Sequence, residues 1–516
     1  MAAGASRAAI SGQQAPAGEP GAHSPGQRSA PRAPSPRPTP RPTPSRRPAA
    51  LTRAWWHTPR LVRGLGALCL VSLLTVAAVA ATVLGGARDG INTIGHRSAP
   101  QAVRAADLYF ALSDMDAQAA NLLLIGADPD YATLRTQTLT TYQDRRAQAD
   151  ADLQQAAVAA AADPAGQHAV QTVLGDLGDY EALEARAQLL EDQATAPAGK
   201  PSQAALDTYR QATDLLRGKL LPAADQVTAA NAATVDRVYA TQRGDLGAGW
   251  WWMLGTGVLA LGALAALQRT LAIRFRRRVS LPLAAGTLLA VLALAAGLGL
   301  ASGADRHLVT AKVSAYDSVI ALSRARAVAY DSNADESRYL IDPSRAATYE
   351  QSYFEKTQSI VHIDGVTLDG YNPALTQLAD QHYDNQSTVG FGGFLGTELR
   401  NITFPGEQAA AERVLAAFQK YQADDHNIRE LQAQGKLKDA VTLDTGTGPG
   451  QSNADFGHLS DAFGDVLGIN QKAFDGAVSA ADSDLGTGVE VTGGLILAAA
   501  LALTVLGVRP RLKEYS

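Results

Sequence analysis

Four long apolar runs constrain this 516-residue chain more than any other feature of its sequence. An α-helix needs about 20 residues to cross a bilayer, and each run has roughly that length with no charged residue near its centre. Such runs exclude a single soluble domain. They predict an all-α membrane protein with four transmembrane helices, at residues 61–86, 250–273, 281–302 and 489–508.

The charged residues between these runs predict the orientation of the chain. Ten arginines and one acid lie in residues 1–63, and short basic segments lie at residues 274–280 and 509–516. The positive-inside rule places these three regions in the cytoplasm. The remaining segments are acidic, with 13 basic against 21 acidic residues in 87–248 and 14 against 26 in 303–487. We therefore expect a multi-pass protein of the cell membrane with both termini cytoplasmic and both acidic segments outside.

Residues 1–60 differ in composition from the rest of the chain. They contain 12 of the 24 prolines and few large apolar side chains, so they cannot bury a core. We expect a disordered, Pro/Arg-rich cytoplasmic tail that tethers the first span. The alternative is a docking or phosphorylation segment, because Ser and Thr stand among the prolines and arginines at positions such as Ser35 and Thr39.

The two acidic segments look like copies of one unit. Ala111-Leu112-Ser113 after the first span is echoed by Ala321-Leu322-Ser323 after the third, and Asp128-Pro129 is echoed by Asp342-Pro343. Apolar residues in both segments recur at spacings of four and three, which is the seam of a bundle helix. The pattern predicts two tandem extracytoplasmic four-helix bundles with sensor-like architecture, at 87–248 and 303–487.

The second bundle is expected to carry an insertion at residues 361–405, where helical periodicity fades and glycines and aromatic residues gather. Its aromatic content favours packing over disorder. One interpretation is a hydrophobic cap that seals the bundle end, and the other is a pocket or partner-docking surface with two arginines as anion contacts. The candidate binding residues are Arg345, Tyr371, Tyr383, Phe391, Phe394, Arg400 and Phe404.

Catalytic and metal-binding motifs are not evident in the sequence. Cys69 is the only cysteine, and the histidines form no His-Glu-x-x-His pair. The glycine-rich stretch 390–396 is not followed by Gly-Lys-Ser/Thr, so it is not a phosphate-binding loop. We expect neither an enzyme nor a metal or other cofactor.

Geometry points to a receptor or relay, since the bundle helices begin almost where the spans end and could carry a small shift across the membrane. The loop at 274–280 and the tail at 509–516 are too short for a signalling domain, so a separate cytoplasmic protein is expected to receive the message. The basic loop offers the contact residues Arg274, Arg276, Arg277 and Arg278.

Four spans, two outside helical domains, a basic loop and an Ala/Gly/Arg-rich composition resemble the GlnX-type membrane proteins of actinobacteria. The resemblance covers residues 51–516 as architecture, and it carries over no functional residue. It implies a non-enzymatic transmembrane signal relay between an extracytoplasmic glutamate-binding lipoprotein and the cytoplasmic serine/threonine protein kinase G, which would report amino-acid availability.

Two other functions stay open at this point. The chain could be a structural or accessory subunit of an exporter or envelope complex, or a chemoreceptor that binds its solute directly. Membrane lipid is an expected partner and nucleic acid is not. A homodimer is a further expectation, because sensor bundles often pair, although the tandem copies could satisfy that pairing within one chain.

Overall fold

The computed structural model describes residues 49–159, 164–275 and 280–513, and apart from one isolated bridge between His362 and Gly392 their regular structure is helical. Four of these helical stretches are long and apolar enough to cross a membrane, namely Arg60–Ile125, Gln203–Arg274, Leu281–Ile341 and Ser452–Pro510. The predicted all-α fold with four spans is therefore confirmed. Residues 1–48 of the predicted tail lie outside the described residues.

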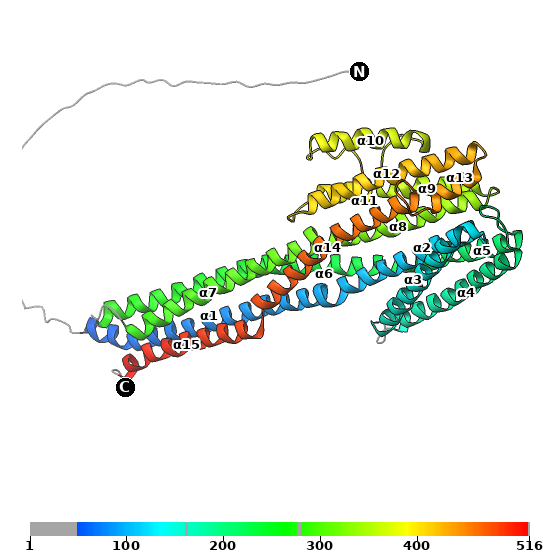
Figure 1. The fold of residues 1–516 in the computed structure, drawn as a ribbon. Helices are drawn as coiled ribbons and strands as arrows, with labels where there is room; N and C mark the ends of the chain where they lie inside the picture. Colours follow the sequence, from blue (N-terminus) through cyan, green and yellow to red (C-terminus); the bar gives the residue numbers. More distant parts are fainter. Residues whose placement is uncertain (1–48, 160–163, 276–279, 514–516) are drawn as a thin grey trace, which may run out of the picture. The chain divides into compact units, whose positions relative to one another are not determined.

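Each span continues into one of the two helical bundles as part of one long helical rod (Figure 1). The first, second and third rods each contain a π-helical turn, which accommodates an extra residue without ending the helix. The first rod consists of α1 (Ala49–Thr93), η1 (Ile94–Ser98) and α2 (Ala99–Ile125). The second consists of α5 (Gln203–Leu215), η3 (Leu216–Leu220) and α6 (Leu221–Phe275). The third consists of α7 (Leu281–Val309), η4 (Thr310–Tyr316) and α8 (Asp317–Ile341). The fourth joins α14 (Ser452–Asp484) to α15 (Thr487–Lys513) through a short turn.

The first bundle has the four helices that the sequence predicts. Helices α3 (Ala132–Ala159) and α4 (Pro164–Ala194) complete it beside α2 and the rod of α5 and α6. Helix α2 is followed by Asp128-Pro129 and a 3-10 turn, η2 (Pro129–Tyr131), in which the Asp128 carboxylate accepts a hydrogen bond from the Asp130 amide. Its core includes Leu112, Met115 and Tyr180.

The second bundle combines α8, α9 (Ala346–Ile360), α12 (Glu407–Ala433), α13 (Leu437–Thr445) and α14. The expectation that helical structure fades over 361–405 is wrong, because this segment contains α10 (Leu368–Asp384) and α11 (Gly393–Arg400). Helix α10 buries only Tyr371, Leu375, Ala379 and His382, at helical spacings of four, four and three. The mostly polar residues between them hide that pattern in the sequence.

The two bundles share a core. The hydrophobic cluster of the first bundle includes Leu340 and Ile341 of α8 and Val441 of α13. Conversely, Phe110 of α2 packs edge-to-face on Tyr330 of α8, with ring centroids 4.8 Å apart. Helices α2 and α8 therefore form the central pair of the two bundles (Figure 1).

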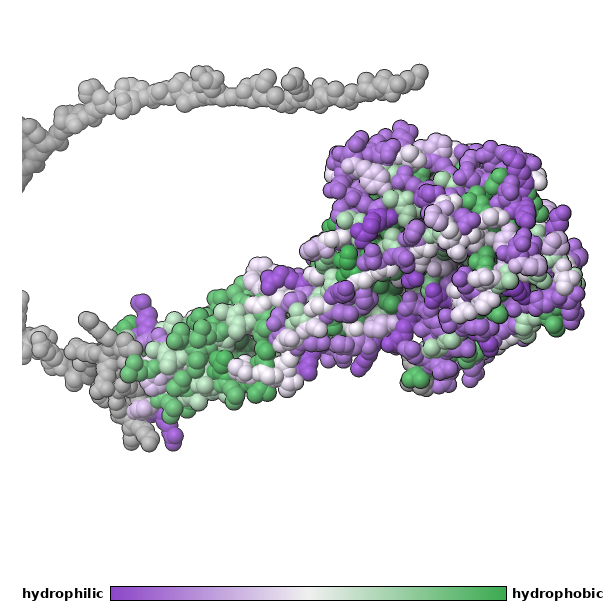
Figure 2. Space-filling view, in the orientation of Figure 1, coloured by the Kyte–Doolittle hydropathy of each residue, from purple (hydrophilic) through white to green (hydrophobic). Residues whose placement is uncertain are grey.

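The spans pack through small residues on some faces and are apolar on their exposed surface. A Cβ on Gly286 would lie 3.2 Å from the Ala500 carbonyl oxygen, and one on Gly507 would lie 3.1 Å from Leu283, so α7 and α15 are in close contact. The surface around the spans is largely hydrophobic, whereas the bundle surface is largely hydrophilic (Figure 2). This contrast is what a lipid environment around the spans requires.

Candidate functional site

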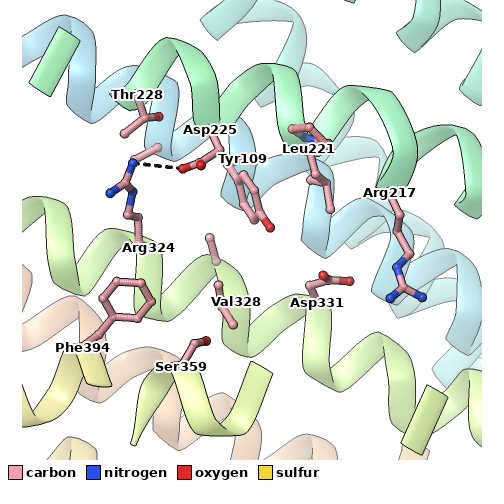
Figure 3. A pocket seen from close by; sticks show the side chains of 13 residues that line it. Tyr109, Arg217, Leu221, Asp225, Thr228, Arg324, Val328, Asp331, Ser359 and Phe394 are labelled. Carbon is pink, nitrogen blue, oxygen red and sulfur yellow. Dashed lines mark ion pairs between the residues drawn. The ribbon is translucent and has the colours of Figure 1, made fainter. Parts of the chain in front are cut away.

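A cleft of about 510 Å³ lies between the two bundles (Figure 3). Its walls come from α2, η3 and α6 on one side and from α8, α9 and α11 on the other. The lining residues are Ala106, Tyr109, Arg217, Leu221, Pro222, Asp225, Thr228, Arg324, Ala327, Val328, Asp331, Ser359 and Phe394. Sites for small ligands usually have volumes of about 300–1,000 Å³, so the cleft has room for a small solute.

Helical spacing explains why these side chains share one space. Arg217, Leu221, Asp225 and Thr228 are four, four and three residues apart, so they lie on one face of the η3–α6 rod. Arg324, Val328 and Asp331 form a similar stripe on α8, and Tyr109 enters between the two stripes from α2 (Figure 3).

Charges of both signs line the cleft in equal number. Arg324 Nη2 lies 3.0 Å from Asp225 Oδ1, which joins the two bundles across the cleft. Arg217 donates a 2.6 Å hydrogen bond to Ser352 Oγ and lies 3.7 Å from Asp335. The cleft therefore offers two guanidinium groups and two carboxylates without a large net charge.

Two polar groups at the cleft add to its binding capacity. The Nε–H of Arg324 is buried and has no hydrogen-bond partner among the described residues. Burial, with the nearby Asp331 and Asp225 carboxylates, raises the pKa of Tyr109 well above its usual value. The Tyr109 hydroxyl therefore stays protonated at neutral pH and can donate a hydrogen bond to a solute.

Further along α8 from the span than the cleft residues, Arg338 connects the bundles through a fully buried ion network. Its side chain is 0% exposed and pairs with Asp116 of the first bundle and with Asp335, 2.5 Å away. Its Nε–H also donates a 3.0 Å hydrogen bond to the Tyr209 hydroxyl. Burial alone would raise the pKa of Asp335, but Lys356 and Arg338 lower it to about 2. Asp331 contacts both Arg338 and Lys356 and also lines the cleft, so it links the two sites.

A second buried cluster in the second bundle is acidic. It joins Glu336 of α8, Asp425 of α12 and Asp444 of α13. Burial raises the pKa of Asp425 to about 7, despite the nearby Arg429. Burial also raises the pKa of Asp444 to about 7, and the charge of Asp425 adds to this increase. Burial also raises the pKa of Glu336 well above its usual value. Among the described residues, no group of three or more His, Cys, Asp or Glu side chains is arranged to hold a metal ion.

The structure does not bring the seven predicted binding residues together, and only Phe394 lines the cleft. Tyr371 and Phe391 are buried in the core of the second bundle, as a hydrophobic cap would be. Tyr383 is exposed and its hydroxyl bonds to Gln419, whereas Phe404 is partly buried beside the cluster at the junction of the bundles with the spans.

The two predicted anion contacts are occupied by protein groups. Arg345 pairs with Asp214 of the first bundle at 3.0 Å. Arg400 donates hydrogen bonds to the carbonyl oxygens of Gly396, Val389 and Phe391, so it holds the start of α11 in place. Of the predicted cytoplasmic contacts, Arg274 is exposed near the end of α6, and Arg276, Arg277 and Arg278 lie outside the described residues.

The sequence pattern alone missed the charged residues of the cleft. Arg324 stands between Ile320 and Ala327 in the apolar seam of α8, and Asp225 stands in a stripe with Leu221. A charge inside an apolar seam was the available signal. Its meaning depends on the opposite helix, which the sequence does not identify.

Comparison with known proteins supports a sensing role for this region. Residues 90–240 match the family model described as an actinobacterial sensor domain. The match begins near the outer end of the first span and covers the first bundle, including Tyr109, Arg217 and Asp225. No curated protein and no solved structure matches the chain. The sensor-domain match and the four apolar helices together indicate a sensor-type membrane protein.

Proposed function

We propose that this protein is a non-enzymatic transmembrane signal relay. It senses an extracytoplasmic solute, or a lipoprotein that carries one, and passes the signal to a separate cytoplasmic protein such as a serine/threonine kinase. The sensor-domain match supports the sensing half of this proposal. The resemblance to GlnX-type proteins suggests amino-acid availability as the signal and protein kinase G as the receiving enzyme.

The observation that carries the proposal is the continuity between the cleft walls and the spans. Tyr109 lies on the rod of the first span, Arg217 and Asp225 lie on the rod of the second, and Arg324 and Asp331 lie on the rod of the third. No loop separates the cleft from the membrane on any of these three rods. A change in cleft width therefore displaces spans, because packed helices move as rigid elements by about 1–2 Å.

The cleft residues suggest how a solute would drive such a change. A solute with a carboxylate and an ammonium group would compete for Arg324 and Asp225, which pair with each other across the cleft. Binding shifts the equilibrium only if the solute has different affinities for the open and closed arrangements. Replacing a direct 3.0 Å pair by two solute-mediated contacts supplies that difference, since it requires the bundles to separate locally.

The decisive measurement is binding of amino acids to the full chain in lipid nanodiscs by isothermal titration. We expect saturable binding that Arg217→Gln combined with Arg324→Gln weakens at least tenfold. Arg413→Gln is the matched control, because Arg413 forms an exposed ion pair with Asp465 on the second bundle away from the cleft. Equal binding by the cleft variant and the control would remove the cleft from the proposal.

Capture of a solute-binding lipoprotein is the second route for the signal, and a pull-down on the same nanodiscs tests it. Tyr383→Ala is the suitable probe of the 361–405 segment, since Tyr383 is exposed while Tyr371 and Leu395 belong to the core. Binding heat in the amino-acid titration would favour direct solute binding by this chain. Capture of a lipoprotein in the pull-down would favour the lipoprotein route. Failure of both would favour the structural or accessory subunit.

Transmission is measured as a distance between two span ends. In a Cys69→Ala background, spin labels at Leu61→Cys and Leu281→Cys report on the first and third spans, where both native side chains are exposed. We expect the solute or lipoprotein to shift this distance by about 1–2 Å. An unchanged distance at saturating ligand would argue against a relay.

A further inference from the structure

The membrane region contains a second hollow that the sensing function does not use. It lies between α1 and α15 and has a volume of about 320 Å³. Arg63, Gly66 and Ala67 line it from α1, and Thr504, Val508 and Arg509 line it from α15. Both arginines are at the same end of their spans, next to the basic segments of the chain.

Uneven packing of the four spans creates this hollow. Helix α15 is in close contact with α7 at Gly286 and Gly507, and α1 joins α6 and α7 through a cluster that includes Cys69, Leu73 and Leu267. Toward α15, however, α1 presents Gly66 and Ala67. A Cβ on Gly66 would lie 3.7 Å from Val508, an ordinary contact distance, so α1 and α15 meet less tightly here than α7 and α15 do, and the hollow opens beside this contact.

The walls of the groove are apolar and its mouth is cationic. The Thr504 hydroxyl donates to the Ala500 carbonyl at 2.8 Å, so this proton is not available to an occupant. Arg63 and Arg509 are exposed, and neither forms an ion pair or hydrogen bond with another described residue. Among the described residues, no carboxylate lines the groove to balance them.

We propose that this groove binds one anionic phospholipid, with an acyl chain between α1 and α15 and the phosphate between Arg63 and Arg509. An empty apolar groove would forfeit dispersion contacts, which an acyl chain restores. Guanidinium groups bind phosphate through two parallel hydrogen bonds, and paired basic residues at a span end favour a net negative headgroup. A zwitterionic headgroup fits less well, because its own cation would face two arginines with no acid beside them.

The lipid would occupy the end of the spans from which the proposed relay sends its signal, but its binding does not depend on that relay. A bound lipid keeps α1 and α15 apart at a fixed distance.

Native mass spectrometry of the full chain, exchanged between phosphatidylglycerol and phosphatidylcholine of equal chain length, tests the site. We expect one phosphatidylglycerol per chain to survive detergent exchange, with at least tenfold weaker retention of phosphatidylcholine. Arg63→Gln combined with Arg509→Gln should remove this preference. Arg306→Gln is the matched control, because Arg306 is an exposed arginine beyond the opposite end of the third span. Gly66→Leu should reduce retention of both lipids by filling the groove while both charges remain.

A photoactivatable phosphatidylglycerol tests the same site on the unaltered chain. Labelled peptides should map to residues 63–70 and 504–509. Labelling spread evenly over all spans, equal retention of the two lipids, or a lipid-free dimer of this chain would each overturn the proposal. Solute binding at the cleft is measured separately, so failure of either proposal leaves the other intact.

Discussion

At the scale of single residues, Arg338 stands out as a large charged side chain that is fully buried between the two bundles. It is fully buried, and its partners Asp116, Asp331 and Asp335 come from both bundles. A buried ion pair adds little over an apolar replacement of both partners, but loss of one partner leaves uncompensated charge. Arg338 therefore specifies how the bundles pair more than it adds to stability.

Removing this guanidinium should be costly. Arg338→Ala leaves Asp116 and Asp335 buried beside a cavity, and we expect the free energy of unfolding to fall by about 3–5 kcal/mol. Denaturant unfolding followed by circular dichroism measures it. Arg413→Ala is the control, since it removes an exposed pair worth about 0–1 kcal/mol. Equal effects of the two substitutions would contradict the assigned role of Arg338.

The acidic cluster predicts a pH dependence of stability. Because burial raises the folded-state pKa of Asp425 and Asp444 from 3.8 to about 7, the folded protein binds more protons than the unfolded chain between these values. The stability from these protons is complete below about pH 4 and is lost as pH rises through 7. The nearby Arg429 lowers the pKa of Asp425, but it only partly offsets the increase caused by burial.

Asp444→Asn isolates this contribution, because asparagine keeps the shape and cannot ionise. We expect the gain in unfolding free energy to be at least about 1.4 kcal/mol larger at pH 8 than at pH 5, which corresponds to one pKa unit. Thermal unfolding at the two pH values is the measurement. A variant that is destabilised equally at both would show that Asp444 is ionised in the folded state.

At the scale of elements, small residues in the spans do not all have the same role. The sequence pattern of Gly255, Gly286 and Gly297 predicts close helix packing at each. Gly286 and Gly297 do face neighbours, with a Cβ on Gly297 3.0 Å from Met253 Sδ, but Gly255 has nothing within 4 Å. The prediction is wrong for Gly255 because periodicity does not show which face meets a helix.

Cys69 reports on the packing of the first span. It is 0% exposed within the cluster that joins α1 to α6 and α7. We expect N-ethylmaleimide to label it at least tenfold more slowly in membranes than Leu61→Cys in a Cys69→Ala background, since Leu61 is exposed. Rapid labelling, or a disulfide between the Cys69 residues of two copies, would show that α1 packs differently. A homodimer formed through other surfaces stays a prediction.

At the scale of the whole molecule, the two bundles depend on each other. Arg210 of the first bundle pairs with Asp342 of the second at 2.5 Å, and Arg345 of the second bundle pairs with Asp214 of the first. With the shared core around Phe110 and Ile341, these pairs make α2 and α8 parts of one folding unit.

Separate bundles should therefore be poorly stable. Residues 87–248 alone would leave Asp116 without Arg338, and a domain has only about 5–15 kcal/mol of stability to lose. We expect each fragment to unfold well below the temperature at which the linked outside region unfolds, and mixing the fragments to restore part of the loss. Calorimetry of the two fragments, alone and mixed, measures this. Two fragments as stable as the intact region would contradict a shared core.

The sequence by itself determined the four spans, the helical class and the division into two bundles, because hydrophobic length and periodicity act locally along the chain. Only the tertiary structure decided that Arg345 and Arg400 bind protein groups, that Tyr371 belongs to the core, and that Arg217, Asp225, Arg324 and Tyr109 line one cleft. These residues come from rods far apart in the chain, so their roles depend on the pairing of α2 with α8, and periodicity within one helix carries no information about that pairing.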